Sequence, residues 1–243
     1  MLFRIEELDQ ICNIKPTGVI HVGAHLAEEK NEYERYHWTP VIWIEAQPEL
    51  VRILEEQLSN NKHSIIQAAI WHKDDEIRIL NIASNSQSSS FLEFDSHRKS
   101  YPEITKVGEI EVRTSRLDTI LSERSRGNFI NIDIQGVELQ ALKSLGKLIA
   151  NIDYIYVEVN RKEVYAECTK VDEIDRYLAI FGFKRRFTRW ILKHGWGDAL
   201  YVRSEVTLKI KRKQIMRLKI ATFIFYMKQA ISIFWKYKNR LEN

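Results

Sequence analysis

Cysteine, proline and glycine are scarce in this chain of 243 residues, which contains 2 Cys, 4 Pro and 9 Gly. Two cysteines, Cys12 and Cys168, make neither a disulfide framework nor a zinc site. The low glycine and proline content excludes collagen-like and low-complexity chains. A long apolar run is also missing near the start, where Glu6 and Glu7 interrupt the stretch that an export signal needs. These absences predict a protein of the reducing cytoplasm.

Apolar side chains are plentiful, whereas charge is unevenly distributed. Hydrophobic residues make up 44% of the chain, which is enough to bury a sizeable core. Residues 206–243 carry 10 Lys or Arg and one acid, which leaves 27 of the 37 bases and 32 of the 33 acids for residues 1–205. An acidic body with a basic, aromatic tail predicts that only the tail is attracted to anionic surfaces, and it disfavours nucleic acid as a partner.

Residues 19–202 alternate short β-branched apolar runs with segments of helical period, which is typical of βαβ units around a mostly parallel sheet. A polar loop at 83–90 breaks this rhythm, and such a loop inside a compact domain is usually functional or mobile. We divide the chain into an N-terminal helical lead-in at 1–16, an α/β domain at 17–205 and the tail at 206–243. We expect main strands at 19–22, 41–45, 64–69, 129–134 and 152–159, extra strands at 76–82 and 109–113, a hairpin of 184–190 with 199–202, and helices at 28–36, 48–58, 137–145 and 171–181.

Three residues at strand ends carry the first functional signal. Gly23 follows a strand and leads into a helix, so a ligand can approach the backbone there. Glu45 ends the next strand roughly 20 residues later, where a nucleoside-binding fold places the acid that bonds ribose hydroxyls. Asp133 ends a later strand and is expected to face the same crevice. The alternatives are a tight turn at Gly23, a solvated strand end at Glu45 and a structural acid at Asp133.

Further polar residues are candidates with an alternative structural role. Glu138 falls in the first turn of a helix, where it serves either the helix dipole or catalysis. Glu158 and Asn160 end a strand, and either could face a substrate. His194 and Asp198 flank the glycines of the predicted hairpin; each could face a substrate, and the alternative for both is an ordinary turn residue. Their spacing gives no metal-ligand pattern.

Five segments together resemble, in order and spacing, the FkbM-type S-adenosylmethionine-dependent methyltransferases. They lie at 18–25, 43–48, 116–120, 131–139 and 195–201. The resemblance covers about residues 17 to 203, so it assigns the α/β domain to methyl transfer. It implies a class I methyltransferase fold: a Rossmann-like, mostly parallel seven-stranded sheet flanked by helices, whose last strand runs antiparallel.

The resemblance also implies roles for named residues. The turn after the first strand would receive the methionine part of S-adenosylmethionine (SAM), Glu45 the ribose, and Gln67 and Ala68 the adenine, with Ala46 as a further cofactor-binding residue. Asp133 would lie near the methyl group and is the first candidate for the base, with Glu158 and His194 as further catalytic candidates. Asp133 and Glu158 could supply two ligands to a divalent metal, and we leave that metal open. The turn comprises Val22, Gly23, Ala24 and His25.

Three positions depart from the pattern of the family. His21 stands where an acid usually opens the first motif, and Ala27 stands where a further glycine is expected. Asn131 replaces a lysine often found two residues before the aspartate. These departures bear on the contacts to the methionine carboxylate and on any catalytic use of that lysine.

The resemblance implies O-methylation of a glycan or another small-molecule hydroxyl, with a sugar of a surface polysaccharide or glycolipid precursor as the acceptor. Two other functions stay open: a Rossmann-type nucleotide-binding oxidoreductase, and a non-catalytic adapter that keeps the fold. The uncharged run of the tail, residues 220–227, is too short to cross a bilayer. Its aromatic residues suit the inner face of an anionic membrane, while a helix docked on the body or on a second subunit is the alternative. The aromatic residues are Phe223, Phe225, Tyr226, Trp235 and Tyr237.

Overall fold

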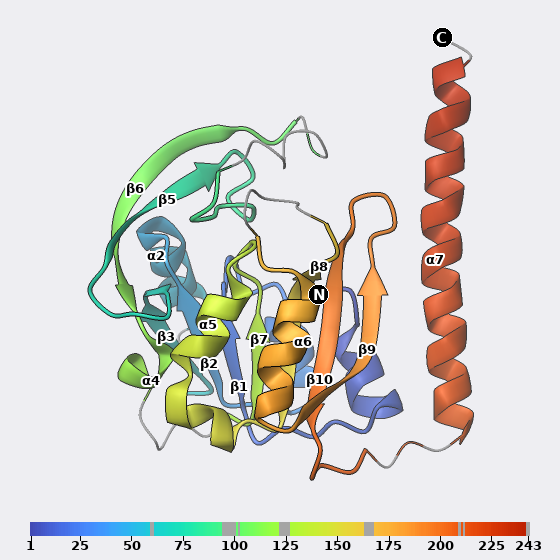
Figure 1. The fold of residues 1–243 in the computed structure, drawn as a ribbon, viewed down its shortest axis with the longest axis horizontal. Helices are drawn as coiled ribbons and strands as arrows, with labels where there is room; N and C mark the ends of the chain where they lie inside the picture. Colours follow the sequence, from blue (N-terminus) through green and yellow to red (C-terminus); the bar gives the residue numbers. More distant parts are fainter. Residues whose placement is uncertain are drawn as a thin grey trace.

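A computed structural model describes residues 1–58, 61–93, 101, 103–121, 127–162, 168–208, 210 and 212–241. Its centre is a seven-stranded sheet of order β3-β2-β1-β7-β8-β10-β9 (Figure 1). The printed pairs among β1, β2, β3, β7 and β8 are parallel, and β10 runs antiparallel to both β8 and β9. This confirms the class I methyltransferase architecture. The strands are β1 (Val19–Val22), β2 (Val41–Glu45), β3 (His63–Gln67), β7 (Phe129–Ile132), β8 (Tyr154–Asn160), β9 (Phe183–Trp190) and β10 (Trp196–Arg203).

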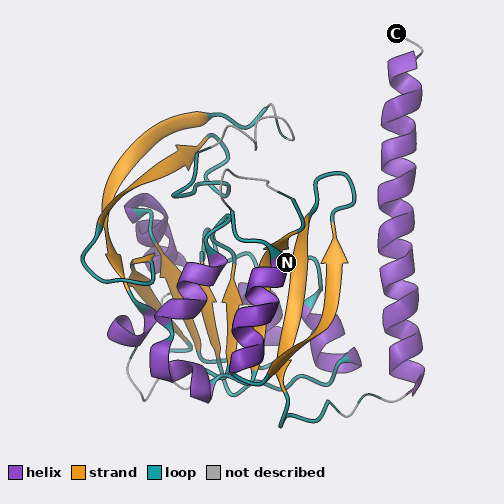
Figure 2. Cartoon of the chain, in the orientation of Figure 1, coloured by secondary structure: helices purple, strands orange, loops and turns teal. Residues whose placement is uncertain are grey.

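Helices cover both faces of the sheet, as the colouring by secondary structure makes clear (Figure 2). Pro48 opens α2, because a proline in the first turn has no N–H that the helix would need. Gly182 follows α6 with φ +78°, a left-handed conformation that ends a helix at low cost. The helical segments are η1 (Glu7–Ile11), α1 (Lys30–Arg35), α2 (Pro48–Gln57), α4 (Leu117–Ile120), α5 (Glu138–Ser144), η2 (Gly146–Asn151), α6 (Val171–Ile180) and α7 (Arg212–Leu241).

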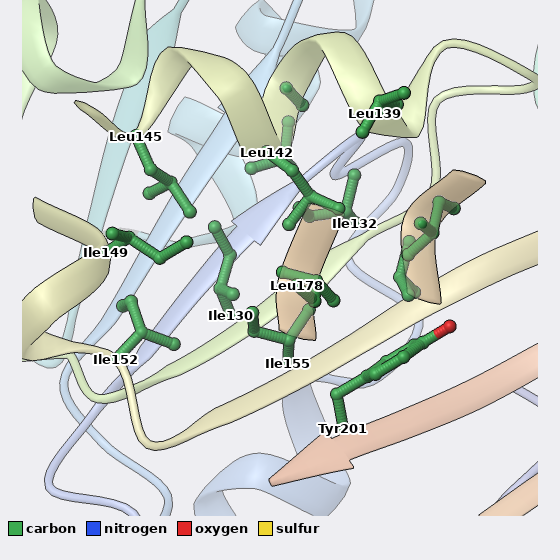
Figure 3. Packing of buried hydrophobic residues seen from close by; sticks show 14 of the residues in the cluster. Ile130, Ile132, Leu139, Leu142, Leu145, Ile149, Ile152, Ile155, Leu178 and Tyr201 are labelled. Carbon is green, nitrogen blue, oxygen red and sulfur yellow. The ribbon is translucent and has the colours of Figure 1, made fainter. Parts of the chain in front are cut away.

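The central strands separate two hydrophobic cores. On one face, the branched residues of β7 and β8 meet leucines of α5 and α6; Figure 3 shows Ile130, Ile132 and Ile155 among Leu142 and Leu178. On the other face, a core rich in aromatic residues joins the N-terminal segment, α1 and α2 to the sheet. All four residues of β1 and of β7 are buried, which explains why three of the four are apolar in each strand; the exceptions are His21 and Asn131.

A second, three-stranded sheet of order β4-β6-β5 rises beside the main one (Figure 1). It corrects the predicted strand at 64–69: the chain leaves the main sheet after Gln67, and β4 (Ala69–Ile70) pairs with β6 instead. The predicted extra strands form β5 (Ile77–Ala83) and β6 (Lys106–Ser115). β6 extends beyond the predicted 109–113 at both ends, because residues 106–113 pair with β5 and Thr114 and Ser115 pair with β4.

The basic tail forms the single long helix α7, which lies along β9 at the edge of the sheet. The Trp190 N–H donates to the Tyr226 hydroxyl at 3.2 Å, and the Leu192 N–H donates to Gln229 Oε1 at 2.9 Å. Within the described part of the chain, no helix combines the length and apolar character needed to cross a bilayer.

Candidate functional site

A cleft of about 970 Å³, including its open mouth, lies at the carboxyl ends of β1, β2, β7 and β8. Strand order reverses between β1 and β7, and open α/β sheets bind ligands at such a reversal. The polar loop at 83–90 forms part of the wall through Ser86, Gln87, Ser89 and Ser90. Eight of the predicted site residues line the cleft: Val22, Gly23, His25, Glu45, Ala46, Ala68, Asp133 and Glu158.

Gly23 brings the end of β1 against the residue that follows β7. Its φ is +85°, and a Cβ atom at this position would lie 2.0 Å from the carbonyl oxygen of Asp133. A side chain is therefore excluded for two reasons: its Cβ atom would overlap the Asp133 backbone, and the left-handed conformation favours glycine. The glycine sets the distance between two walls of the cleft.

Glu45 is buried and accepts three backbone hydrogen bonds. Its Oε1 takes the N–H groups of Ala46 and Gln47, and its Oε2 takes that of His25, each at 2.9 Å. Burial raises the pKa of Glu45, and the three amides act against that rise. A carboxylate offers about four acceptor positions, so roughly one, on Oε2, is left for a ligand hydroxyl.

His25 ties the turn after β1 to the polar loop. Its Nδ1 lies 2.6 Å from Glu28 Oε1, and its Nε2 lies 2.8 Å from the Ser86 hydroxyl. The hydrogen bond to Glu28 raises the pKa of His25. The residue also adopts φ +46°, which is uncommon without glycine. The turn is thus held in place by side chains on both of its sides.

Three carboxyl groups share the floor of the cleft: Asp133, Glu158 and Asp198. Glu158 and Asp198 are direct partners on neighbouring strands, so their side chains lie on the same face of the sheet. Burial, followed by the charge of Asp198, raises the pKa of Asp133 to about 6. Burial and the neighbouring acids raise the pKa of Glu158 well above its usual range, and burial also raises that of Asp198. Such a cluster is the kind of site that a cationic ligand relieves.

Asp198, for which the sequence left open a substrate-facing role or that of a turn residue, is a full member of this cluster. Its Oδ2 accepts hydrogen bonds from the Tyr156 hydroxyl and from the Leu2 N–H, both at 2.5 Å. Tyr156 also lines the cleft. The sequence signal was the position of Asp198 beside the hairpin glycines, but the strand β10 begins at Trp196 and turns this residue inward.

A second cavity of about 810 Å³ adjoins the first and shares Asp133, Glu158 and Asp198 with it. Its wall includes the rings of Tyr101 and Trp196, and the Trp196 Nε1–H donates to the Tyr101 hydroxyl at 2.7 Å. The acids therefore lie between two spaces, one beside β1 and β2 and the other beside this aromatic pair.

Three predicted residues lie elsewhere. Ala24 is buried, with its N–H bonded to the Ile44 carbonyl, and Gln67 is exposed at the end of β3. Neither of these is part of the cleft wall. His194 lines neither cavity and stacks on Tyr101 instead, with ring centroids 4.3 Å apart. His194 thus supports the aromatic wall rather than facing the acids.

Two of the three departures from the family pattern, His21 and Asn131, form a buried polar pair in the wall of the cleft. His21 stacks on Trp43 with ring centroids 4.9 Å apart, and the Asn131 amide lies 3.2 Å from its Nε2. Burial lowers the pKa of His21, so the ring is neutral at physiological pH.

Glu138 is fully buried and accepts the Gly136 N–H at 2.8 Å, which fixes the loop after β7.

Metal ligands are not grouped in the described residues: no set of three or more His, Cys, Asp or Glu side chains there could hold a metal ion.

The family model for the methyltransferase FkbM domain matches residues 21–185, more than half of the chain. The chain belongs to the FkbM methyltransferase family. The matched span of this FkbM chain contains the glycine turn, Glu45, Asp133 and Glu158. No curated protein matches the chain in sequence.

Solved structures similar to this FkbM chain include methyltransferases with cofactor bound. TrmK of M. capricolum, in complex with S-adenosylhomocysteine (SAH), is 10% identical with a TM-score of 0.48, covering 96% of this chain and 85% of that chain. The magnesium protoporphyrin IX methyltransferase of Synechocystis PCC 6803, with bound SAM, is 12% identical with a TM-score of 0.48, covering 82% and 76%. A putative tRNA methyltransferase of Streptococcus pneumoniae with SAM is 12% identical with a TM-score of 0.46, covering 97% and 92%.

Proposed function

We propose that this FkbM-family protein is a SAM-dependent methyltransferase that O-methylates a sugar hydroxyl of a surface polysaccharide or glycolipid precursor. Residues 17–205 form its catalytic domain, 1–16 its lead-in and 206–243 its tail. The observation that carries the proposal is the group of buried acids, Asp133, Glu158 and Asp198, between two adjoining cavities.

The charge of the cleft supports SAM over a dinucleotide. Among the described residues that line it, several are acids and none is Lys or Arg. SAM brings a positive sulfur and an ammonium group, which such a wall attracts. The Met1 ammonium group also lines the cleft, but it is paired with Glu29 at 3.3 Å, as the His25 ring is paired with Glu28. A dinucleotide brings a pyrophosphate, which would meet the excess of acids, and a nucleic-acid acceptor would meet the same repulsion. The oxidoreductase alternative is disfavoured on this ground.

The residues present fit the parts of SAM in turn. Glu45 offers its remaining acceptor position to a ribose hydroxyl. Ala46, Ala68 and Ile70 supply an apolar wall for the adenine ring. The backbone at Val22 and Gly23 would hold the methionine part beside Asp133.

Methyl transfer asks the protein mainly to align the acceptor and to take its proton. SAM supplies, when bound, a methyl group on a positively charged sulfur. Asp133 Oδ1 accepts the Gln135 Nε2–H at 2.6 Å, so Oδ2 is the atom left to take the proton from the attacking hydroxyl. Tyr101 and Trp196 line the acceptor side, and aromatic side chains suit the apolar face of a sugar ring. Glu158 adds a neutral carboxyl group that can orient a hydroxyl.

The function is tested by incubating the full chain with SAM labelled in its methyl group and a panel of sugars and glycolipid precursors. Label on a sugar oxygen, found by mass spectrometry, supports the proposal. Binding of SAM together with label on a base, an amine or no acceptor of the panel would move the acceptor assignment away from glycans.

Glu45→Gln is expected to weaken SAH binding at least about tenfold and to lower the melting temperature. The amide retains Oε1 for Ala46 and Gln47, but its NH₂ group would face the His25 N–H and lose the acceptor left for the ribose. Calorimetric titration with SAH measures the first effect and thermal unfolding the second. The exposed Gln67→Ala variant at the neighbouring strand end is the control, and unchanged SAH affinity in Glu45→Gln would contradict the ribose assignment.

The pH dependence of kcat/KM for SAM is expected to show an acid limb near pH 6. Asp133 must be ionised to act as a base, and its pKa is raised to about 6, so activity is lost as the pH falls through that value. The acid limb in the pH profile of kcat should lie at a lower pH, because the positive sulfur of bound SAM lowers the pKa of the Asp133 carboxyl group. Glu138 has a pKa raised to about 7 by burial, so Glu138→Gln is the control. If the acid limb disappeared in Glu138→Gln, the limb would report the ionisation of Glu138 and not that of Asp133.

A further inference from the structure

Helix α7 meets the body through one face. The side chains of this face lie three or four residues apart, which places them on one side of a helix. Most of them are polar and make hydrogen bonds: the Gln214 Nε2–H donates to the Gln10 carbonyl at 2.7 Å, and the Gln229 Nε2–H donates to the Trp190 carbonyl at 3.0 Å. The face consists of Gln214, Leu218, Thr222, Tyr226 and Gln229.

The opposite side of α7 carries large apolar side chains that nothing in the described chain covers. Their spacing of four, three, four and four residues follows the turn of a helix, half a turn away from the docked face. Between 44% and 64% of each side chain is exposed. We call them the outer face: Met216, Ile220, Phe223, Met227 and Ile231. Apolar residues thus point outward on a helix whose inner contacts are largely hydrogen bonds.

Basic residues flank the outer face on both sides. Arg217 and Lys228 lie along one border and Lys219 along the other, and all three are exposed. Residues 206–243 contain 10 bases and one acid, so the helix has almost no negative charge to offset them. An apolar stripe bordered by Lys and Arg is the pattern of a helix that lies in the interface of an anionic membrane.

We infer that the outer face of α7 binds the surface of an anionic lipid membrane, with the helix lying flat along it. A second copy of the chain is a poorer occupant, because pairing two outer faces would bring flanking bases together with no acids opposite. The helix runs beside β9 and continues past the body at the end of the sheet where the cleft opens (Figure 1). A membrane along the outer face would therefore pass beside the cleft mouth. The inference does not depend on the reaction proposed above.

The test is sedimentation of the full chain with vesicles of phosphatidylcholine alone or with one third phosphatidylglycerol. We expect binding to the anionic vesicles that falls with salt. The triple variant Ile220→Ser, Phe223→Ser, Met227→Ser should bind at least about tenfold more weakly, because its apolar contact is lost. The matched control replaces Ile79, Val107 and Ile180, which are exposed on other elements, by serine and should bind like the natural chain.

Charge is tested separately with Arg217→Gln and Lys219→Gln, each expected to weaken binding to anionic vesicles about fivefold. SAH titration of every variant shows that the cleft is intact, so a failure here is distinct from a failure of the methyltransferase proposal. Equal binding by the outer-face and control variants, or no binding by the natural chain, would overturn the inference. Light scattering without lipid that finds a dimer, and a monomer for the outer-face variant, would assign the face to a second copy.

Discussion

Asp133→Asn is expected to reduce the rate of methyl transfer at least about a hundredfold, because the amide cannot take the proton of the attacking hydroxyl. The substitution retains Oδ1 as the acceptor for Gln135, so the loop after β7 keeps its hydrogen bond. Steady-state rates at pH 8 with saturating SAM measure the effect. A variant that retains most of its rate would remove Asp133 from the role of base.

The same variant is expected to be more stable than the natural chain when no ligand is bound. The pKa of Asp133 rises from an ordinary 3.8 to about 6 in the fold, so the folded state holds its proton more tightly than the unfolded state does. The free energy of unfolding therefore falls as pH rises through this window, by about 3 kcal/mol once Asp133 is ionised. Asparagine carries no such cost. Its gain in melting temperature should be present at pH 8 and vanish below about pH 4.

Glu158→Gln is the matched control for the rate. Burial and neighbouring acids raise the pKa of Glu158 well above its usual range, so this carboxyl group is neutral where Asp133 is ionised. An amide resembles a neutral carboxyl group in shape and donates a hydrogen bond. The variant should therefore lose much less activity than Asp133→Asn. Equal losses in the two variants would mean that the acids act together rather than in separate roles.

Gly23→Ala is expected to destabilise the protein by about 3–5 kcal/mol, which is near the upper end for single substitutions. The added Cβ would lie 2.0 Å from the Asp133 carbonyl oxygen, which is backbone and can move only with β7, and φ is +85°. Strain and overpacking both contribute. The melting temperature should fall by about 10 °C or more.

Gly108→Ala is the control for Gly23→Ala, because a Cβ there would meet nothing within 4 Å. Thermal unfolding of both variants decides the matter, and the control should stay within about 0.5 kcal/mol of the natural chain. If Gly23→Ala melted as the control does, the close contact between the β1 turn and Asp133 would be wrong, and with it the shape of the cleft.

The elements that the sequence predicted best have clear end signals. β1 and β2 have the predicted bounds because their mostly apolar, mostly buried residues end at Gly23 and Glu45, and α2 begins at Pro48 as expected. The mostly parallel seven-stranded sheet with an antiparallel last strand followed from the family resemblance, whereas its strand order came from the structure. The meeting of Gly23, Glu45 and Asp133 in one cleft followed from the carboxyl ends of parallel strands.

Sequence could not predict which strand-end side chains turn inward. Gln67 and Ala68 are neighbours, but the strand ends at Gln67, whose side chain is exposed, and the chain then turns so that only Ala68 reaches the cleft. The pairing of Tyr101 with Trp196 joins residues 95 positions apart, and no local pattern signals it. In α7, apolar residues occur around the whole helix, so the contacts with the body were needed to separate an inner face from an outer one.

The central claim is that the acid-lined cleft binds SAM, and calorimetric titration of the full chain with SAM, SAH and NAD at pH 8 tests it most directly. We expect SAM and SAH each to bind at one site per chain and NAD to show no binding, because the described cleft wall offers acids and no Lys or Arg to a pyrophosphate. Binding of NAD in preference to SAM, or no binding of either SAM or SAH by the folded chain, would contradict the account.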